Sequence, residues 1–270
     1  MDKITEITGV YEYIIAQLAM ERYSFSWEEL TAKVSKTESG LVNELNRLVK
    51  KKEIVNLRAG FYLILPPRYR SYGKLPVELY IEPLFAYLNK PYYMAFYSAA
   101  AFHGASHQQV QQDYLITKVP NMPDVKKGPT HLKVYATSTW PEKNITQKKS
   151  DAGYFKISSP ALTAADLLHY QTKVGGINRV FTTLEELVET ITPTDIKDLL
   201  AWYPHISTIQ RLGYMLEHIN AGHEGIQQIS EYLQQRRHYP VLLSPKKEQN
   251  AGYTGNKWKV DVNVELESDL

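Results

Sequence analysis

Cysteine is absent from this sequence of 270 residues, and so is any long apolar run. The first absence excludes disulfides, thiolate catalysis and cysteine-ligated zinc or iron–sulfur centres. The second excludes a membrane-spanning helix, which needs about 18 consecutive apolar residues. Residues 1–20 alternate charged and aliphatic side chains instead of forming a leader peptide. We therefore expect a cytoplasmic protein without a membrane partner.

The common catalytic signatures are also missing. There is no phosphate-cradling loop ending in lysine, no nucleophile elbow and no dinucleotide fingerprint. A polymerase-type nucleotidyltransferase needs a Gly-Ser turn followed by two nearby aspartates that hold magnesium, whereas Gly104-Ala105-Ser106 is followed by a lone Asp113. We predict no catalytic residue, no cofactor and no enzyme activity.

Two histidine pairs are candidate metal ligands. His103 and His107 have helical spacing, but Gly104 lies between them and no carboxylate supports them, so a structural or capping role is favoured. His218 and His223 are more typical of a helix C-terminus than of a ligand set. We therefore predict no metal site.

Asp166 lies inside an apolar run, at residues 161–168. It is either a buried, hydrogen-bonded structural group or a functional one. The structural interpretation is favoured.

The sequence is long enough for two domains, and its 43% hydrophobic and 22% charged residues are ordinary for a globular protein. We predict an α+β protein in which an N-terminal winged helix-turn-helix, residues 1–66, precedes a larger mixed α/β domain, residues 77–270. Between them, residues 67–76 form a proline-rich linker that is not expected to be helical.

Residues 26–65 carry the clearest pattern. Ser26 is a typical N-cap, and it predicts a helix from Trp27 to Val34. After a break at residues 35–37, apolar residues recur at helical spacing up to about Lys51. The predicted buried stripe of this second helix is Leu41, Leu45, Leu48 and Val49.

The opposite face of that second helix is cationic and hydrogen-bonding. This pattern is typical of a recognition helix in the major groove of double-stranded DNA. Asn43 and Arg47 are assigned to base edges, since amides and guanidinium groups make bidentate contacts there. Phosphates are assigned to Lys36, Ser39 and Lys50. Lys51 extends the predicted DNA-binding set.

Glu53 to Leu57 and Phe61 to Leu65 are predicted strands of a wing, joined by a short turn with Gly60. Arg58, near the tip, would reach a phosphate. From residue 33 to residue 70 there are nine Lys and Arg but three Glu, an excess of six positive charges in a chain of net charge +2. Such concentration favours a phosphate backbone as partner, although winged helices also serve as protein-binding modules.

The remaining elements are predicted from periodicity. Helices are expected at 77–88, 92–103, 161–171, 182–190, 195–203 and 206–219, and strands at 111–119, 133–137, 153–158 and 258–266. Residues 143–150 are polar and cationic, and a solvated loop is favoured there over a second DNA contact.

Four blocks in order resemble the AbiEi antitoxin family: YYMAFYSAAAFHG at 92–104, ISSPALTAADLL at 157–168, RLGYMLE at 211–217 and WKVDVN at 258–263. The resemblance implies an antitoxin and transcriptional autorepressor of a bacterial type IV toxin–antitoxin system linked to abortive phage infection. It implies binding to inverted repeats in the protein's own promoter, and antagonism of a nucleotidyltransferase-like toxin that need not be bound directly. In the blocks, Asp166 and Arg211 are candidates for polar partners inside the domain.

Two other functions stay open at this point. The C-terminal domain could be an enzyme that acts on nucleic acid or nucleotides, with Asp113, Asp151, Asp166 and Asp261 as candidate carboxylates if they cluster. The protein could also be a regulator that senses a small molecule, which requires a sizeable pocket.

Overall fold

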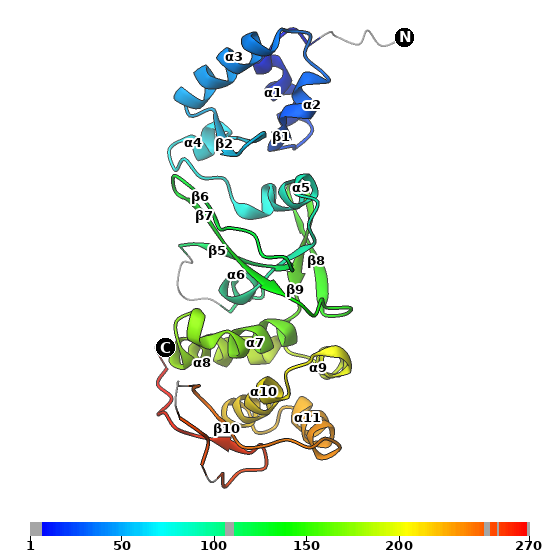
Figure 1. The fold of residues 1–270 in the computed structure, drawn as a ribbon, viewed down its shortest axis with the longest axis vertical. Coiled ribbons are helices and arrows are strands. Elements are labelled where there is room, and N and C mark those ends of the chain that lie inside the picture. Colours follow the sequence, from blue (N-terminus) through cyan, green and yellow to red (C-terminus); the bar gives the residue numbers. More distant parts are fainter. Residues whose placement is uncertain (1–6, 106–110, 246–248, 253, 269–270) are drawn as a thin grey trace.

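The computed structural model describes residues 7–105, 111–245, 249–252 and 254–268. Figure 1 shows three parts stacked along the long axis of the molecule: an N-terminal unit, a central sheet and a helical layer. Helices and strands are mixed along the chain, as the α+β prediction requires. None of the described helices is both long and apolar enough to span a membrane.

The N-terminal unit combines three helices with a small antiparallel sheet in the order β1-β3-β2. Its elements are α1 (Val10–Ala19), β1 (Ser24–Ser26), α2 (Trp27–Thr31), α3 (Glu38–Lys50), β2 (Ile54–Arg58) and β3 (Phe61–Ile64). The two helices and two strands predicted from residues 26–65 are all present, with slightly shifted ends. Strand β1, which pairs with β3, was not predicted.

Local sequence explains where α2 and α3 begin. The Ser26 side chain accepts a hydrogen bond from Glu29 N, while the Glu29 carboxylate accepts from Ser26 N, forming a capping box. Thr37 caps α3 with its side chain alone, accepting from Gly40 N. Leu41, Leu45 and Leu48 are buried as predicted. The prediction for Val49 is wrong, because its side chain is 37% exposed.

The proline-rich segment is part of the packed structure. The expectation that it contains no helix is wrong: α4 (Pro67–Arg70) is a single helical turn that places Pro67 at its first position, where a missing N–H is tolerated. Farther along, Leu75 is fully buried in the same core cluster as Leu63 and Leu84. The boundaries at residues 66 and 76 stay predictions.

The central sheet has six strands in the order β6-β7-β5-β4-β9-β8. Pairs β5–β7 and β4–β9 are parallel and the other three pairs are antiparallel. The strands are β4 (Tyr92–Met94), β5 (Asp113–Lys118), β6 (Val125–Lys127), β7 (Thr130–Thr137), β8 (Ile145–Ser150) and β9 (Gly153–Ser158).

Alternation along β4 divides the core between the two faces of the sheet. Tyr92 and Met94 join the cluster shared with β3 and with α5 (Ile81–Tyr87), while Tyr93 joins the cluster beneath the helical layer. The predicted helix at 92–103 is therefore wrong in its first turn; only α6 (Phe96–Phe102) is helical. The predicted loop at 143–150 is mostly strand β8.

The helical layer covers the far face of the sheet (Figure 1). It contains α7 (Pro160–His169), α8 (Ile177–Leu187), α9 (Pro193–Trp202), α10 (Ile206–Ile219) and α11 (Gly225–Gln234), of which α11 was not predicted. Within the residues that the structure describes, three 3₁₀ turns complete the helical elements: η1 (Val77–Leu79), η2 (Gln171–Lys173) and η3 (Val188–Thr190).

The predicted final strand is reduced to a two-residue pair, β10 (Val241–Leu242) and β11 (Val260–Asp261). Trp258 is fully buried instead of alternating, and its ring lies against Gly213 of α10 so closely that a Cβ there would be 2.4 Å from ring carbons.

Candidate nucleic-acid interface

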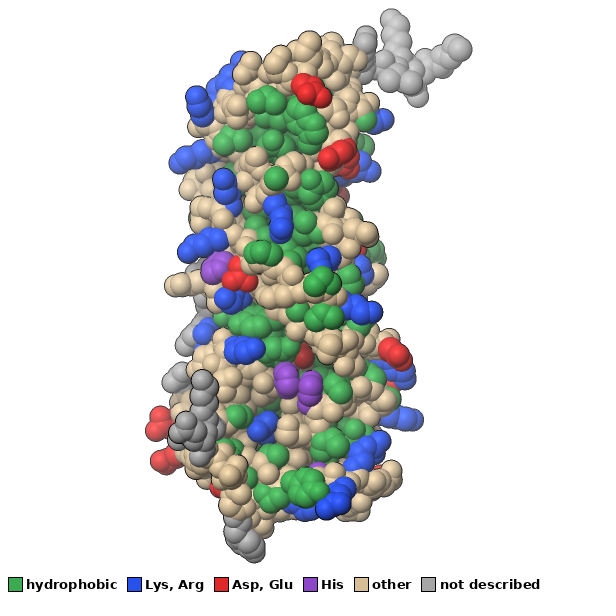
Figure 2. All heavy atoms as spheres, in the orientation of Figure 1, with side chains coloured by type: hydrophobic (Ala, Val, Ile, Leu, Met, Phe, Trp, Pro, Cys, Tyr) green, Lys and Arg blue, Asp and Glu red, His purple; other side chains and the backbone are tan. Residues whose placement is uncertain are grey.

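The exposed face of α3 carries four of the seven residues predicted to bind DNA. Ser39, Asn43, Arg47 and Lys50 are all exposed, on the side of the helix opposite its buried leucine stripe. In Figure 2, Lys and Arg side chains gather along the left edge of the upper third, where Figure 1 places α3. The face is therefore free to meet a partner and carries positive charge.

Asn46 belongs to the same face and was missed by the sequence prediction. At about 100° per residue, it lies about 40° from Lys50 around the helix axis, and its side chain is exposed. Helical spacing alone would have identified Asn46, but the predicted face was counted from Lys36 and omitted it. Val42 and Val49, 44% and 37% exposed, border the face and add apolar surface.

Lys36 is separated from this face. It precedes α3, and its ammonium group is paired with the Glu44 carboxylate, which also accepts a hydrogen bond from Val10 N at 3.0 Å. The hydrogen bond from Lys36 lowers the pKa of Glu44. Much of the Lys36 charge is thus neutralised within the N-terminal unit. The Glu44 carboxylate in turn links α3 to the start of α1.

Lys51 extends the cationic surface at the end of α3, together with Lys52. Both side chains are exposed, and neither is in an ion pair with any carboxylate in the described part of the chain. Cations near a helix C-terminus also interact favourably with the helix dipole.

Arg58 lies at the end of β2 and is half-buried. The turn that follows it is anchored to the central part of the molecule. The Tyr87 hydroxyl of α5 donates to the Ala59 carbonyl at 3.0 Å, and Gly60, with φ of 76°, accepts from Trp27 N at 2.8 Å. The turn expected to project toward DNA therefore packs against α5 and the start of α2.

The histidines have packing partners. His103 ends α6 and lies 2.7 Å from the Ser158 carbonyl, and burial lowers its pKa. His107 lies outside the described residues. His218 stacks on Tyr214, and His223 bridges the Ile191 carbonyl and Gly225 N.

Asp166 is buried, only 4% exposed, and accepts a hydrogen bond from the Tyr93 hydroxyl at 3.0 Å. Burial raises the pKa of this carboxyl to about 8, although the Tyr93 hydrogen bond opposes the change. Arg211 donates from Nε to the Leu242 carbonyl at 2.8 Å. Asp166 and Arg211 therefore each make a polar contact inside the domain.

The other candidate carboxylates have separate partners. Asp113 pairs with Lys74 at 3.2 Å and Asp151 with Arg68 at 3.6 Å, while Asp261 accepts from Gly252 N at 2.7 Å. Within the described ranges, no group of three or more His, Asp or Glu is arranged to hold a metal ion.

Residues 93–218 match the family model of the AbiEi antitoxin C-terminal domain. This segment is an AbiEi antitoxin domain. The resemblance drawn from the sequence is thereby confirmed, and the second and third blocks, at 157–168 and 211–217, lie inside the matched AbiEi segment. Most of the first block does too, whereas the fourth, at 258–263, lies beyond it. The AbiEi domain supports a role in a toxin–antitoxin system.

Among solved structures, the chain is similar to the RV2827C protein from Mycobacterium tuberculosis, with a TM-score of 0.62 and 13% identity over 92% of this chain and 89% of that one. This likeness extends the shared fold well beyond the AbiEi segment to almost the whole chain. An antigenic nucleotidyltransferase-like protein from Paracoccidioides brasiliensis aligns with a TM-score of 0.32 and 12% identity over 51% of this chain and 88% of that one. No curated protein matches the sequence.

Proposed function

We propose that this protein is a DNA-binding transcriptional autorepressor and the antitoxin of a type IV toxin–antitoxin system of the abortive-infection kind. The N-terminal unit acts as a winged helix-turn-helix that places α3 in the major groove of inverted repeats in its own promoter. The observation that carries this proposal is the exposed polar and cationic face of α3, formed by Ser39, Asn43, Asn46, Arg47 and Lys50.

The chemistry of that face suits DNA. Two asparagines and an arginine offer bidentate hydrogen bonds to base edges, while Lys50 and Lys51 offer charge to phosphates. The order of elements, with α3 followed by the β2–β3 hairpin and β1 closing the sheet, supports a winged-helix arrangement. Because the turn after Arg58 packs on α5, the base-reading role falls to α3 rather than to the hairpin.

The AbiEi segment supplies the antitoxin activity, acting in the cytoplasm against a nucleotidyltransferase-like toxin, with or without direct contact. We propose that it works without catalysis. The separate partners of Asp113, Asp151, Asp166 and Asp261 support this, since metal-dependent nucleotidyl transfer needs carboxylates converging on one ion.

The test is a pair of assays in cells that carry the protein, its upstream DNA fused to a reporter, and the toxin encoded beside it. The double variant Asn43→Ala, Arg47→Ala should lose repression and keep toxin neutralisation. The matched control Lys197→Ala, Gln234→Ala changes exposed side chains of α9 and α11, at the opposite end of the molecule (Figure 1), and should keep both. Repression by the Asn43, Arg47 variant equal to that of the wild type would contradict the proposal.

A further inference from the structure

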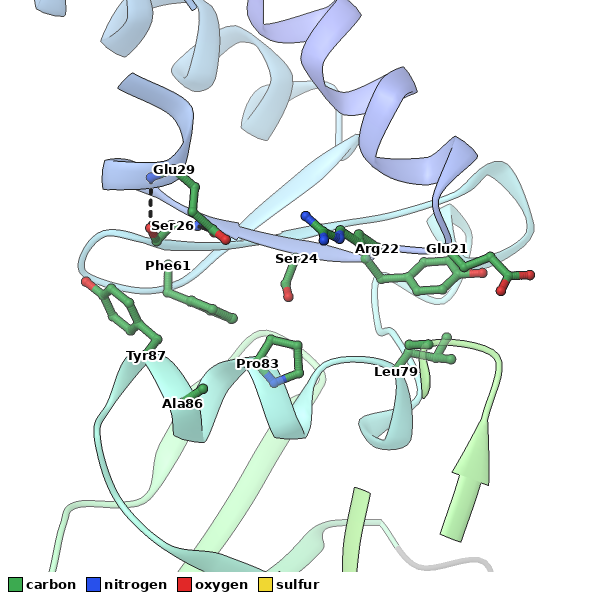
Figure 3. A pocket seen from close by; sticks show the side chains of 12 residues that line it. Glu21, Arg22, Ser24, Ser26, Glu29, Phe61, Leu79, Pro83, Ala86 and Tyr87 are labelled. Carbon is green, nitrogen blue, oxygen red and sulfur yellow. Dashed lines mark hydrogen bonds between the residues drawn. The ribbon is translucent and has the colours of Figure 1, made fainter. Parts of the chain in front are cut away.

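A cavity of about 490 Å³ lies between the N-terminal unit and α5. Figure 3 shows its two walls. One is apolar and is formed by Phe61, Leu79, Pro83, Ala86 and Tyr87. The other is polar and includes Arg22, Ser24 and Glu29. Its volume falls within the range of about 300 to 1,000 Å³ that small-molecule sites occupy.

The Ser24 hydroxyl is the most informative group in this cavity. Ser24 is only 8% exposed, and its side chain makes no hydrogen bond with any described residue. In Figure 3 the hydroxyl points from β1 into the space above Pro83 and Leu79. Its neighbour Ser26, by contrast, uses its hydroxyl to cap α2. A hydroxyl that lines a cavity and has no protein partner among the described residues can donate to or accept from a ligand atom placed there.

The polar wall offers both signs of charge. Arg22 has no carboxylate partner in the described part of the chain. Glu29 commits Oε2 to Ser26 N at 2.7 Å, and its second oxygen makes no hydrogen bond within the described residues. Both side chains line the same cavity and are drawn in Figure 3. The pKa of Tyr13 is raised to about 12 by burial and further by Glu29, against a lowering by Arg22.

We propose that this cavity binds a small zwitterion with an apolar side chain, the chemistry of a hydrophobic α-amino acid. The carboxylate of the ligand pairs with Arg22 and accepts from the Ser24 hydroxyl. Its ammonium group pairs with Glu29. The side chain of the ligand packs on Phe61, Pro83 and Tyr87, which form the apolar wall.

The cavity lies at the joint between the two parts of the molecule whose relative position decides where α3 points. Tyr87 and Phe61, whose rings are 5.3 Å apart, join those parts and also line the cavity. A ligand that touches both walls holds them in one arrangement. This inference goes beyond the proposed function and does not rest on it, because ligand binding is measured without DNA.

Calorimetric titration of the full chain with L-phenylalanine, L-tyrosine and L-leucine tests the proposal. At least one of them should bind saturably. For the best ligand, the analogue without the amino group and the analogue without the carboxylate should each bind about tenfold more weakly or worse, since each loses one charged contact. The absence of saturable binding by all three amino acids overturns the proposal.

Variants locate the binding site. Arg22→Ala should weaken binding about tenfold or more. Ala86→Trp, at an exposed position of the apolar wall, should abolish binding by filling the cavity. Lys197→Ala, far from the cavity, should leave binding unchanged. Thermal unfolding midpoints equal to that of the wild type establish that the variants are folded. If both cavity substitutions leave binding unchanged, the measured heat of binding comes from another site, and the proposal is overturned.

Discussion

The Tyr87 hydroxyl donates a hydrogen bond to the Ala59 carbonyl at 3.0 Å, and the same hydroxyl lies 2.5 Å from where a Cβ on Gly60 would be. Tyr87 belongs to α5, and Ala59 and Gly60 form the β2–β3 turn. The contact therefore fixes the hairpin against the central part of the molecule and leaves α3 as the free surface of the N-terminal unit.

Gly60→Ala should destabilise the fold for two reasons. Its φ of 76° is in the left-handed region, where a non-glycine residue costs about 1 to 2 kcal/mol, and its Cβ would collide with Tyr87. Gly128→Ala is the matched control, with φ of 54° and open space around the added Cβ. In urea denaturation Gly60→Ala should lose more unfolding free energy than Gly128→Ala; equal losses would mean that the Tyr87 contact carries no energy.

Asp166→Asn should change how stability depends on pH. An unfolded aspartate ionises near its ordinary pKa of 3.8, whereas Asp166 in the folded chain stays protonated up to a pKa of about 8. Between these two pKa values the folded state binds one proton more than the unfolded state. The contribution of Asp166 to the free energy of unfolding is therefore largest below pH 4 and falls by about 1.4 kcal/mol per pH unit toward pH 8.

Asparagine is neutral throughout and still accepts from Tyr93. The unfolding free energy of Asp166→Asn, measured relative to wild type by urea denaturation, should therefore rise steadily from pH 4 to pH 8. A difference that stays flat over this window would show that Asp166 ionises normally in the folded chain.

Asn46→Ala should weaken binding to the specific promoter site. Removing one bidentate amide contact to a base costs about 1 to 3 kcal/mol of discrimination. Binding to unrelated DNA should be unaffected, because the amide carries no charge for phosphates. Fluorescence anisotropy with the promoter and a scrambled duplex measures both, and equal weakening on the two duplexes would assign Asn46 to the backbone instead.

Much of the N-terminal unit was predictable because its signals are local. Ser26 caps a helix through residues three positions away, and Leu41, Leu45 and Leu48 repeat at the helical period, so the sequence alone indicates α2 and α3. Asp166 was also interpreted correctly as a buried, hydrogen-bonded carboxyl, since a lone carboxylate in an apolar run has few alternatives.

The errors occur where contacts between residues far apart in the sequence determine the local structure. Tyr92, Tyr93 and Met94 are all buried because β4 lies inside the sheet with helices or strands over both faces, and such a run lacks the alternation of a half-exposed strand. Strand β8 is an edge strand without a fully buried residue, so it resembles a loop. The sequence near Arg58 does not indicate that the Tyr87 hydroxyl contacts the adjacent turn.

The most direct test of the central claim is a salt-titrated gel shift on the DNA upstream of the protein's own gene. The wild type and the control Lys197→Ala, Gln234→Ala should bind this DNA in preference to a scrambled duplex, with affinity falling as salt rises. Asn43→Ala, Arg47→Ala should lose the preference. Equal preference by this variant, or no preference by the wild type, would contradict the account and point to a protein partner for α3.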